Sequence, residues 1–315
     1  MRRRLSRGFD LHRIRVPTNG RLKGLGTGRS ATRLGERSQS VVDAHFEETS
    51  SYWESVYEDP SLVGNVYRNR RAVTLAWIDS LGLRASAQIL DVGCGRGLLS
   101  TMLASRGFAV TAVDHVTDML DATRRHATEA GVSDRVSTGL ADVHSLEFGD
   151  GSFDLVIALG VVPWLHSPTA AMAEMVRVLK PEGFLLASAD NRGALTGFVE
   201  PLENPVLHPA REMLKRVLEE HGRRHRAAKR NRPISRRELD RLIASLGLER
   251  VRWQTLGFGP FTVFRRRLLP DSLGAPLYDR LQAAADRGAT AWKSTGAQHL
   301  FLARKNGEGG LGPRP

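Results

Sequence analysis

Residues 89–99 read ILDVGCGRGLL, and this stretch decides the fold. A short apolar run ends at Asp91, and Gly93, Gly95 and Gly97 follow at every second position before a helical pattern begins. Glycines at this spacing let the backbone adopt left-handed conformations and approach a ligand closely at the carboxyl end of a buried strand. The stretch therefore predicts a strand, a tight turn and a helix that together bind a nucleotide-like cofactor.

A dinucleotide-binding turn is the first alternative for this stretch. Its fingerprint, GxGxxG, needs Gly or Ala at the third position so that the helix packs closely against the strand. This chain has Leu98 at that position. The spacing therefore disfavours NAD as the cofactor.

Outward from the turn, short β-branched runs alternate with helical stretches, as in a parallel sheet with crossover helices. The runs predict seven strands, at 88–92, 110–114, 136–140, 153–159, 183–189, 249–256 and 298–304. Amphipathic stretches predict helices at 97–106, 117–130 and 168–179, the last of which is ended by Lys180-Pro181-Glu182-Gly183. The expected fold is α/β, with a doubly wound, seven-stranded and mostly parallel sheet.

Composition divides the chain into segments. Residues 1–40 hold 11 Lys or Arg against 2 acidic residues, so the rest of the chain carries only about +3 of the formal net charge of +12. The leader is expected to be a disordered, solvated tail, with weak attachment to anionic lipid or RNA and an organellar presequence as alternatives. We expect a basic leader at 1–40, a helical cap at 41–84, the main domain at 85–305 with insertions at 191–234 and 257–296, and a disordered tail at 306–315.

Several classes of protein are excluded or disfavoured by composition. No stretch approaches the ~18 consecutive apolar residues of a membrane span, and no apolar run follows the basic start as in a secretory signal. The single cysteine, Cys94, excludes an intramolecular disulfide framework and is interpreted as a small packing residue. No His, Asp and Glu cluster stands at ligand spacing, so no metal is expected. A cytoplasmic location is expected.

Four ordered blocks over roughly residues 85–190 resemble class I S-adenosylmethionine-dependent methyltransferases. An acid stands ahead of GxGxG, VTAVDHVTDML follows at 110–120, LADVHSLEFGDGSFDLVIALGVVPWLHSP at 140–168, and AAMAEMVRVLKPEGFLLASADN at 170–191. The resemblance implies a Rossmann-like fold, with S-adenosyl-L-methionine as the cofactor. It implies cofactor contacts from Asp91, Gly93, Gly95, Gly97, Asp114, His115, Met119, Asp142, Val143 and Leu159.

The resemblance also implies separate roles for these positions. Asp114 would hold the ribose hydroxyls, Met119 and Val143 would lie against the adenine, and Asp142 would accept from the adenine amino group. A carboxylate at the end of a strand suits two vicinal hydroxyls. Asp91 would orient backbone amides of the turn or reach the cofactor's amino group through water, and a turn-stabilising role is its alternative.

The chain departs from the family after the fourth strand. Many small-molecule members have Glu-His before the leucine there, but this chain has Pro163 and Trp164. His166 follows two residues later and is the candidate catalytic base, with an exposed loop histidine as the alternative. Trp164 either packs over the acceptor or closes the core. The weaker histidine candidates are His144, His208 and His299.

The insertions are expected to hold acceptor specificity. Residues 257–278 combine Phe258, Phe261, Phe264 and Tyr278 with Arg265, Arg266 and Arg267, which predicts either an apolar lid with a basic rim or a helical cap with a solvated charged face. Residues 221–237 contain eight Lys or Arg and no acid, which suits phosphate contact or an exposed helix. The leading aromatic residues Tyr52, Trp53, Tyr57 and Tyr67 either close over the cofactor or pack internally.

The sequence therefore predicts a methyltransferase acting on an oxygen, carbon or nitrogen atom of a small-molecule or lipid-like acceptor, hydrophobic or anionic, such as those of quinone, polyketide or glycolipid pathways. One alternative is a nucleic-acid (RNA) methyltransferase, which the basic runs favour. The fourth strand argues against it, because ALGVVPW lacks the Asn/Asp-Pro-Pro-aromatic turn of amino-methylating enzymes. Another is a non-catalytic cofactor-binding scaffold. Weak peripheral lipid contact is expected, and the oligomeric state is left open.

Overall fold

The computed structural model describes residues 59–201, 233–264 and 266–307, together with the single residues 42, 46, 56, 57, 204 and 207. The expected leader at 1–40, nearly all of the tail at 306–315 and most of the insertion at 191–234 lie outside the described residues. The same holds for Tyr52, Trp53, His208 and Arg265. Of the basic run at 221–237, only residues 233–237 are described, and Arg236 and Arg237 begin a helix.

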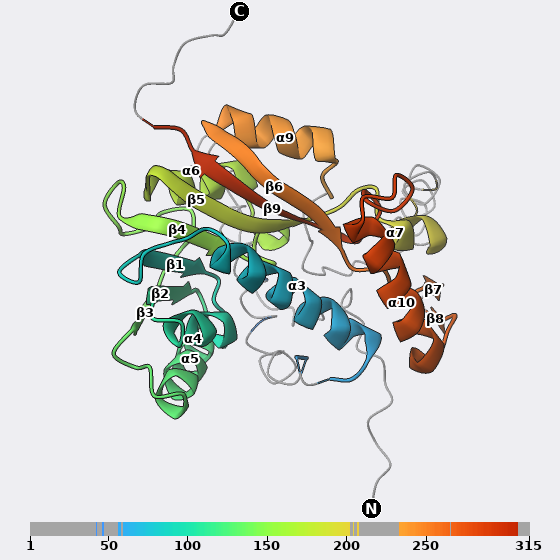
Figure 1. Ribbon diagram of the computed structural model, residues 1–315, viewed down its shortest axis with the longest axis horizontal. Coiled ribbons are helices and arrows are strands. Elements are labelled where there is room, and N and C mark those ends of the chain that lie inside the picture. Colours follow the sequence, from blue (N-terminus) through green and yellow to red (C-terminus); the bar gives the residue numbers. More distant parts are fainter. Residues whose placement is uncertain are drawn as a thin grey trace, which may run out of the picture.

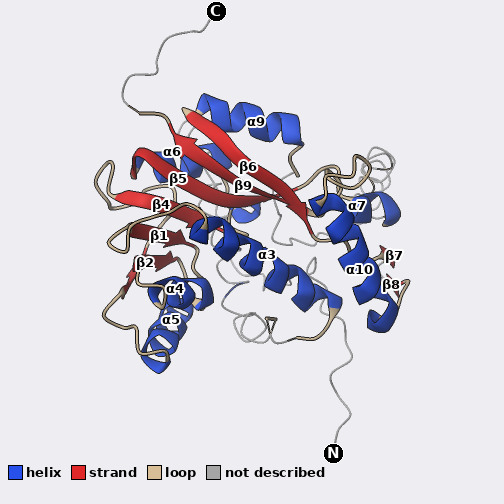
Figure 2. Ribbon diagram, viewed as in Figure 1, coloured by secondary structure: helices blue, strands red, loops and turns tan. Residues whose placement is uncertain are grey.

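A seven-stranded sheet forms the centre of the molecule, in the order β3-β2-β1-β4-β5-β9-β6 (Figures 1 and 2). The first five strands pair in parallel, whereas β9 runs antiparallel to both β5 and β6. Their bounds are Gln88–Val92 (β1), Ala109–Asp114 (β2), Val136–Leu140 (β3), Phe153–Ala158 (β4), Leu179–Asp190 (β5), Leu248–Leu256 (β6) and Gln298–Lys305 (β9). The predicted fold class, a mostly parallel seven-stranded sheet, is confirmed.

Helices cover both faces of this sheet, because parallel strands are apolar on both sides. In β1, Leu90 faces the core under α6 and α9, while Ile89 faces the core under α3 and α4. This alternation is the period of two that a strand imposes on its side chains. The helices are Leu62–Asp79 (α3), Leu98–Ala104 (α4), Thr117–Glu129 (α5), Pro168–Arg177 (α6), Leu195–Val199 (α7), Arg236–Ser245 (α9) and Asp271–Asp286 (α10), with a 3-10 turn at Val162–Trp164 (η1).

The second insertion, 257–296, contains a short hairpin and a long helix. Strands β7 (Thr262–Val263) and β8 (Arg266–Arg267) pair antiparallel beside α10. Helix α10 packs against α3, where Asn69 Nδ2 donates to Tyr278 Oη at 3.0 Å. In Figure 1, α10 and the hairpin lie at the right-hand edge, beyond α3. Among the described residues, no helix is both long enough and apolar enough to cross a membrane.

The end of α6 differs from the prediction. The helix ends at Arg177 and β5 begins at Leu179, four residues before the expected strand start at 183. Leu179 already pairs with Phe153 of β4, and the register shifts before the next paired residues. The segment expected to be a turn is therefore an irregularity within the strand, which single-sequence turn chemistry does not distinguish from a helix end.

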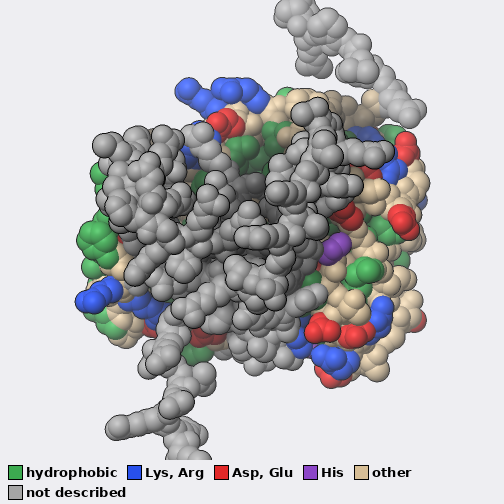
Figure 3. Space-filling view, turned by 180° about the vertical axis from the view of Figure 1, so that it is seen from behind, with side chains coloured by type: hydrophobic (Ala, Val, Ile, Leu, Met, Phe, Trp, Pro, Cys, Tyr) green, Lys and Arg blue, Asp and Glu red, His purple; other side chains and the backbone are tan. Residues whose placement is uncertain are grey.

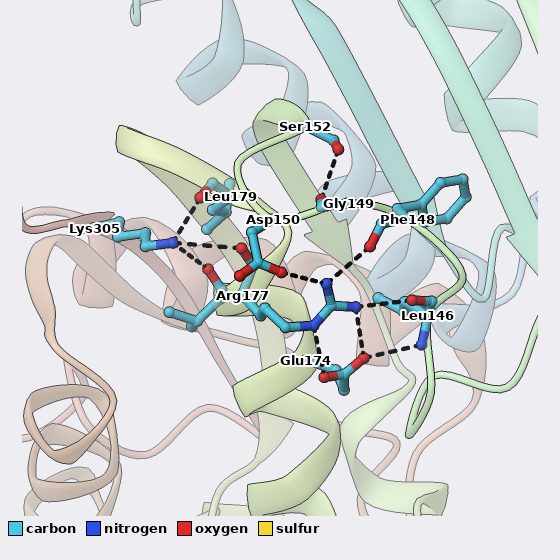
Figure 4. A network of polar contacts seen from close by, with 10 residues as sticks. Leu146, Phe148, Gly149, Asp150, Ser152, Glu174, Arg177, Leu179 and Lys305 are labelled. Carbon is cyan, nitrogen blue, oxygen red and sulfur yellow. Dashed lines mark hydrogen bonds and ion pairs between the residues drawn. The ribbon is translucent and has the colours of Figure 1, made fainter.

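A polar network fixes the loop between β3 and β4 onto α6 (Figure 4). Arg177 donates to both carboxylate oxygens of Glu174 at 2.9 Å, to the carbonyls of Leu146 and Phe148 at 2.8 Å, and to Asp150 at 2.7 Å. Such forked, charge-assisted contacts restrict geometry more than a single bond does. The network thus holds the loop that begins directly after β3 in one position.

Candidate functional site

A cavity of about 230 Å³ lies at the carboxyl ends of β1, β2, β3 and β4, with α3 contributing part of its wall. This is the edge at which open α/β sheets bind ligands. Nine of the ten predicted cofactor residues line it: Asp91, Gly93, Gly95, Asp114, His115, Met119, Asp142, Val143 and Leu159. The tenth, Gly97, is the N-cap residue of α4 and lies outside the lining.

The glycine turn is required by backbone geometry at two of its positions. Gly93 has φ of +63°, and a Cβ added there would lie 2.5 Å from Val161 Cγ2. Gly97 has φ of +71°, and a Cβ there would lie 2.4 Å from Thr123 Cγ2. Both conformations are costly for other residues, and both positions lack room for a side chain. The turn therefore needs glycine for its own shape as well as for its approach to the cavity.

Asp114, the last residue of β2, holds the turn to the neighbouring strand. Its carboxylate accepts from the backbone N–H of Gly95 at 2.9 Å and from that of Val116 at 3.0 Å. Burial raises the pKa of Asp114 above its ordinary value, against the lowering effect of these two bonds. A mostly buried carboxylate at a cavity wall retains lone pairs for hydroxyl donors of a ligand.

Asp91 is 3% exposed and accepts from Ser100 Oγ, in α4, at 2.6 Å. Burial raises its pKa from 3.8 to about 7, while the Ser100 hydrogen bond lowers it and the charge of Asp114 raises it. Asp91 thus ties the end of β1 to α4 and also lines the cavity. The contact with Ser100 supports the turn-stabilising alternative without removing the ligand-binding one.

The pKa of Asp91 predicts an unusual dependence of stability on pH. Between about pH 4 and pH 7 the unfolded chain releases the Asp91 proton while the folded chain keeps it, so the stability that Asp91 contributes is lost as pH rises. We expect the free energy of unfolding of Asp91→Asn, relative to the wild type, to increase by about 3 kcal/mol between pH 4 and pH 8. Urea unfolding at the two pH values measures this change.

Ser100→Ala provides the control for this prediction. Removing the hydroxyl that lowers the pKa of Asp91 should shift the pH-dependent loss of stability to higher pH. A difference between Asp91→Asn and the wild type that is the same at pH 4 and pH 8 would contradict the protonated state of Asp91.

Asp142 and His144 form a pair on the adenine side that the resemblance implies. His144 Nδ1 donates to Asp142 Oδ1 at 2.8 Å, and the His144 backbone N–H donates to the same oxygen at 2.9 Å. Partial burial alone would raise the pKa of Asp142, but these bonds hold it below its ordinary value. Asp142 is therefore ionised over the physiological range and suited to accept a hydrogen bond.

His166, the candidate base, is exposed and lies outside the cavity lining. Its ring lies against that of His144, with centroids 3.7 Å apart. The neighbouring Trp164 and Leu165 do line the cavity, and Trp164 meets Phe46 edge to face at 5.3 Å. Trp164 therefore forms part of the cavity wall, whereas His166 does not line the cavity.

Arg70 is a cavity residue that the sequence analysis missed. It is 6% exposed, lines the cavity and donates through Nη1 to Gln298 Oε1 at 3.2 Å. Its guanidinium also stands 5.0 Å from the Tyr67 ring centroid and beside Gly160, at the end of β4. The sequence signal that could have identified Arg70 is its spacing. It lies four positions before Thr74, on the inward stripe of the helix, where a charged residue is unusual.

The aromatic residues of the second insertion separate into two groups. Phe258 and Tyr278 are 0% and 2% exposed and belong to a small core with Leu62, so they close the fold. Phe264 is 65% exposed.

His299 is buried, and burial lowers its pKa to about 4. His299 bonds to Trp253 and the Ile234 carbonyl and is absent from the cavity lining, so it is structural.

Comparison with known protein families and sequences agrees with this geometry. Residues 90–187 match a methyltransferase domain family. The chain is 33% identical over 120 residues to a ubiquinone biosynthesis O-methyltransferase of Paracidovorax citrulli, covering 38% of this chain and 50% of that protein. It is 31% identical over 160 residues to a protein of the same description from Shewanella halifaxensis, covering 50% of this chain and 65% of that one. The chain thus spans between half and just under two thirds of these relatives.

Solved structures share the fold. Magnesium protoporphyrin IX methyltransferase from Synechocystis PCC 6803, solved with bound SAH, superposes with a TM-score of 0.57 at 15% identity, covering 85% of this chain and 100% of that one. The [4+2]-cyclase SpnF superposes with a TM-score of 0.55 at 18% identity, covering 85% and 96%. Residues 90–187 are thus similar to a methyltransferase domain, and the two solved structures share the fold of the chain.

Proposed function

We propose that the chain transfers a methyl group from S-adenosylmethionine to a small-molecule acceptor of hydrophobic or anionic character. The observation that carries the proposal is the cavity at the carboxyl edge of the sheet, which gathers the glycine turn and the strand-end carboxylates of a methyltransferase domain. The similarity to ubiquinone biosynthesis O-methyltransferases supports a lipid-like acceptor methylated on oxygen.

The cavity suits S-adenosylmethionine along its whole length. Strand order places Asp142 after β3 and Asp114 after β2, while Gly93 follows β1 and Gly160 follows β4. An adenine near Asp142 and a ribose near Asp114 would direct the amino-acid part toward β1 and β4. The ribose hydroxyls would donate to the Asp114 carboxylate. The ammonium group would lie near Asp91, and its positive charge would favour the ionised form of that carboxyl group.

Arg70 completes the fit at the amino-acid end. Its guanidinium lines the cavity beside Gly160, and in the described part of the chain it contacts the neutral Gln298 side chain and the Tyr67 ring. A buried guanidinium favours an anionic partner. The anion that S-adenosylmethionine carries is its α-carboxylate, so Arg70 would bind that group.

Replacing Arg70 should weaken binding of the amino-acid part alone. Arg70→Met is expected to raise the Kd for S-adenosylhomocysteine about 10-fold to 100-fold, since a hydrogen bond to a charged group contributes about 1.5–3 kcal/mol. The Kd for 5′-methylthioadenosine, which lacks the carboxylate, should stay within about twofold. Titration calorimetry measures both values, with the exposed Arg84→Met as the matched control. Equal weakening of both ligands would contradict the assignment.

When bound, S-adenosylmethionine supplies an electrophilic methyl group on a sulfonium sulfur. Methyl transfer would require the acceptor atom to be held in line with the carbon–sulfur bond that is broken, and a hydroxyl acceptor would also have to lose its proton. Trp164, Leu165, Tyr57 and Tyr67 provide apolar walls that exclude water from the cavity and orient an apolar acceptor. The proton passes to a base near this wall.

His166 is the base that we propose, because it follows the cavity wall and its ring lies against His144, which Asp142 holds. His166→Ala is expected to lower kcat at least 10-fold at pH 7 while leaving the Kd for S-adenosylhomocysteine unchanged. Steady-state rates over pH 6–9 test this, because the acidic limb of the rate profile should disappear in the variant. Unchanged turnover would remove the assignment and favour an acceptor that reacts as a preformed anion.

The proposed function is tested by incubating the protein with methyl-labelled S-adenosylmethionine and a fractionated cell extract. Label should enter the organic or small-molecule fraction and vanish with Asp114→Asn. Label in the nucleic-acid or protein precipitate would overturn the small-molecule acceptor. Bound S-adenosylhomocysteine with no labelled product in any fraction would favour a non-methylating use of the fold, which the SpnF cyclase shows to be compatible with this architecture.

A further inference from the structure

Four large apolar side chains are exposed at the edge of the molecule that holds α7, the β7–β8 hairpin and the start of α10. Phe198 is 47% exposed, Phe264 65%, Leu268 55% and Leu273 60%. We call these four residues the apolar tip. Exposed apolar side chains that stand singly need no explanation, but a cluster on adjoining elements marks an interaction surface.

Backbone contacts hold the apolar tip together. The Phe264 N–H donates at 3.0 Å to Oε1 of Glu200. Glu200 is buried and is the residue directly after α7. The Leu268 N–H donates to the Phe261 carbonyl at 3.0 Å and closes the hairpin. Leu273 lies in the first turn of α10, three residues after Pro270. These contacts fix the hairpin to the end of α7, and Leu273 begins the helix that follows the hairpin.

The conformation of Phe264 indicates that its outward position serves a purpose. Its φ is +49°, in the left-handed region that bulky side chains rarely adopt. Such a conformation persists where surrounding contacts enforce it, here the buried Glu200 carboxylate, and it is a starting point for a functional hypothesis. The contact presents the ring to solvent, although apolar burial would favour turning it inward.

Basic side chains stand next to the apolar tip. Arg266 and Arg267 form β8 and are both exposed, and Arg265 precedes them in the sequence. Asp271 pairs with Arg267 at 3.0 Å. Figure 3, seen from behind, shows hydrophobic and basic side chains side by side at its left edge, where β7 and β8 lie when Figure 1 is turned. Apolar residues flanked by arginine match the interface of an anionic bilayer, where rings and alkyl groups enter the acyl boundary and guanidinium groups meet phosphate.

We propose that the apolar tip, with Arg266 and Arg267, docks the protein reversibly on an anionic lipid bilayer. Four side chains on α7, the hairpin and the start of α10 are too few for the roughly 800 Å² per partner of a stable protein interface, but they suit shallow insertion into a bilayer. The surface lies on α10, which packs on α3, and α3 carries Tyr67 and Arg70 of the cavity wall. The docking does not depend on the proposed methyl transfer, because it needs neither cofactor nor acceptor.

Sedimentation of the full chain with vesicles tests the docking. Vesicles of phosphatidylcholine with 30% phosphatidylglycerol, a fraction typical of such assays, should bind the wild type at least tenfold more tightly than phosphatidylcholine alone. Phe264→Ser with Leu268→Ser should weaken binding to the anionic vesicles at least tenfold, and so should Arg266→Glu with Arg267→Glu. The matched control is Leu140→Ser with Val251→Ser, which replaces exposed apolar residues on β3 and β6 and should bind as the wild type does.

Two results would overturn the docking surface. Unchanged vesicle binding by Phe264→Ser with Leu268→Ser would assign binding to charge elsewhere, such as the basic residues of 1–40. Absence of vesicle binding, together with a dimer in sedimentation velocity that the same substitutions dissociate, would make the apolar tip a protein interface. The thermal unfolding midpoint of each variant, expected within about 2 °C of the wild type, confirms that the fold is retained.

Discussion

Asp114→Asn is expected to bind S-adenosylhomocysteine about 100-fold more weakly than the wild type does. Two hydroxyl hydrogen bonds to a mostly buried carboxylate lose most of their strength when the acceptor becomes neutral, at about 1.5–3 kcal/mol for each charge-assisted bond. Asparagine has the same shape as aspartate, and its oxygen can still accept a hydrogen bond from the backbone N–H of Gly95 or of Val116. Titration calorimetry at pH 7.5 measures the change.

The ribose role of Asp114 is separated from its structural role by changing the ligand. The wild type should prefer adenosine over 2′,3′-dideoxyadenosine by a large factor, and Asp114→Asn should lose most of that preference. Asp118→Asn, an exposed carboxylate in the first turn of α5, is the matched control and should bind as the wild type does. A variant that keeps the full preference for adenosine would show that another group holds the ribose.

Gly93→Ala is expected to lower the free energy of unfolding by about 3 kcal/mol, the sum of a left-handed backbone cost and an overpacking cost. The backbone cost follows from φ of +63°, and the overpacking from the 2.5 Å between the new Cβ and Val161 Cγ2. Affinity for S-adenosylhomocysteine should also fall, because Gly93 lines the cavity. Urea unfolding and calorimetry measure the two effects.

Two further variants divide the Gly93 effect into its parts. Gly131 has φ of +68°, and no atom lies within 4 Å of a Cβ added there. Gly131→Ala should therefore lower the free energy of unfolding by the backbone cost alone, about 1–2 kcal/mol. Val161→Ala combined with Gly93→Ala removes the clashing methyl group and should recover about 1–2 kcal/mol relative to Gly93→Ala. If Gly93→Ala lowers the free energy of unfolding no more than Gly131→Ala does, backbone movement relieves the close approach to Val161.

Local periodicity predicted most of the sheet. A strand buried on both faces, such as β1 or β4, leaves a short apolar run that adjacent glycines delimit, and all seven predicted strands are present near their predicted positions. The fifth strand is the exception, since Lys180-Pro181-Glu182-Gly183 resembles a helix end. In the structure Lys180 pairs with Asp154 at 2.7 Å and the segment continues β5. A contact between residues distant in sequence overrides local turn chemistry there.

The candidate site divides in the same way. Residues that follow strand ends were predictable, because parallel strands bring their carboxyl ends to one edge and the motif order names them. Arg70 was not, because α3 precedes the sheet in sequence and only packing places its guanidinium beside Gly160 and Gln298. The sequence placed His166 after the fourth strand, but only the tertiary structure shows that its ring lies against His144 and that Trp164 and Leu165 line the cavity.

The sequence by itself determined the doubly wound sheet, the glycine turn and the cavity residues that follow the strand ends, because these depend on local periodicity and on backbone conformations available to glycine. Only the tertiary structure decided how the second insertion is used, with Phe258 and Tyr278 in a core and Phe264 facing solvent. The physical reason is that burial of an aromatic ring depends on long-range packing, here between α10 and α3, which no local pattern contains.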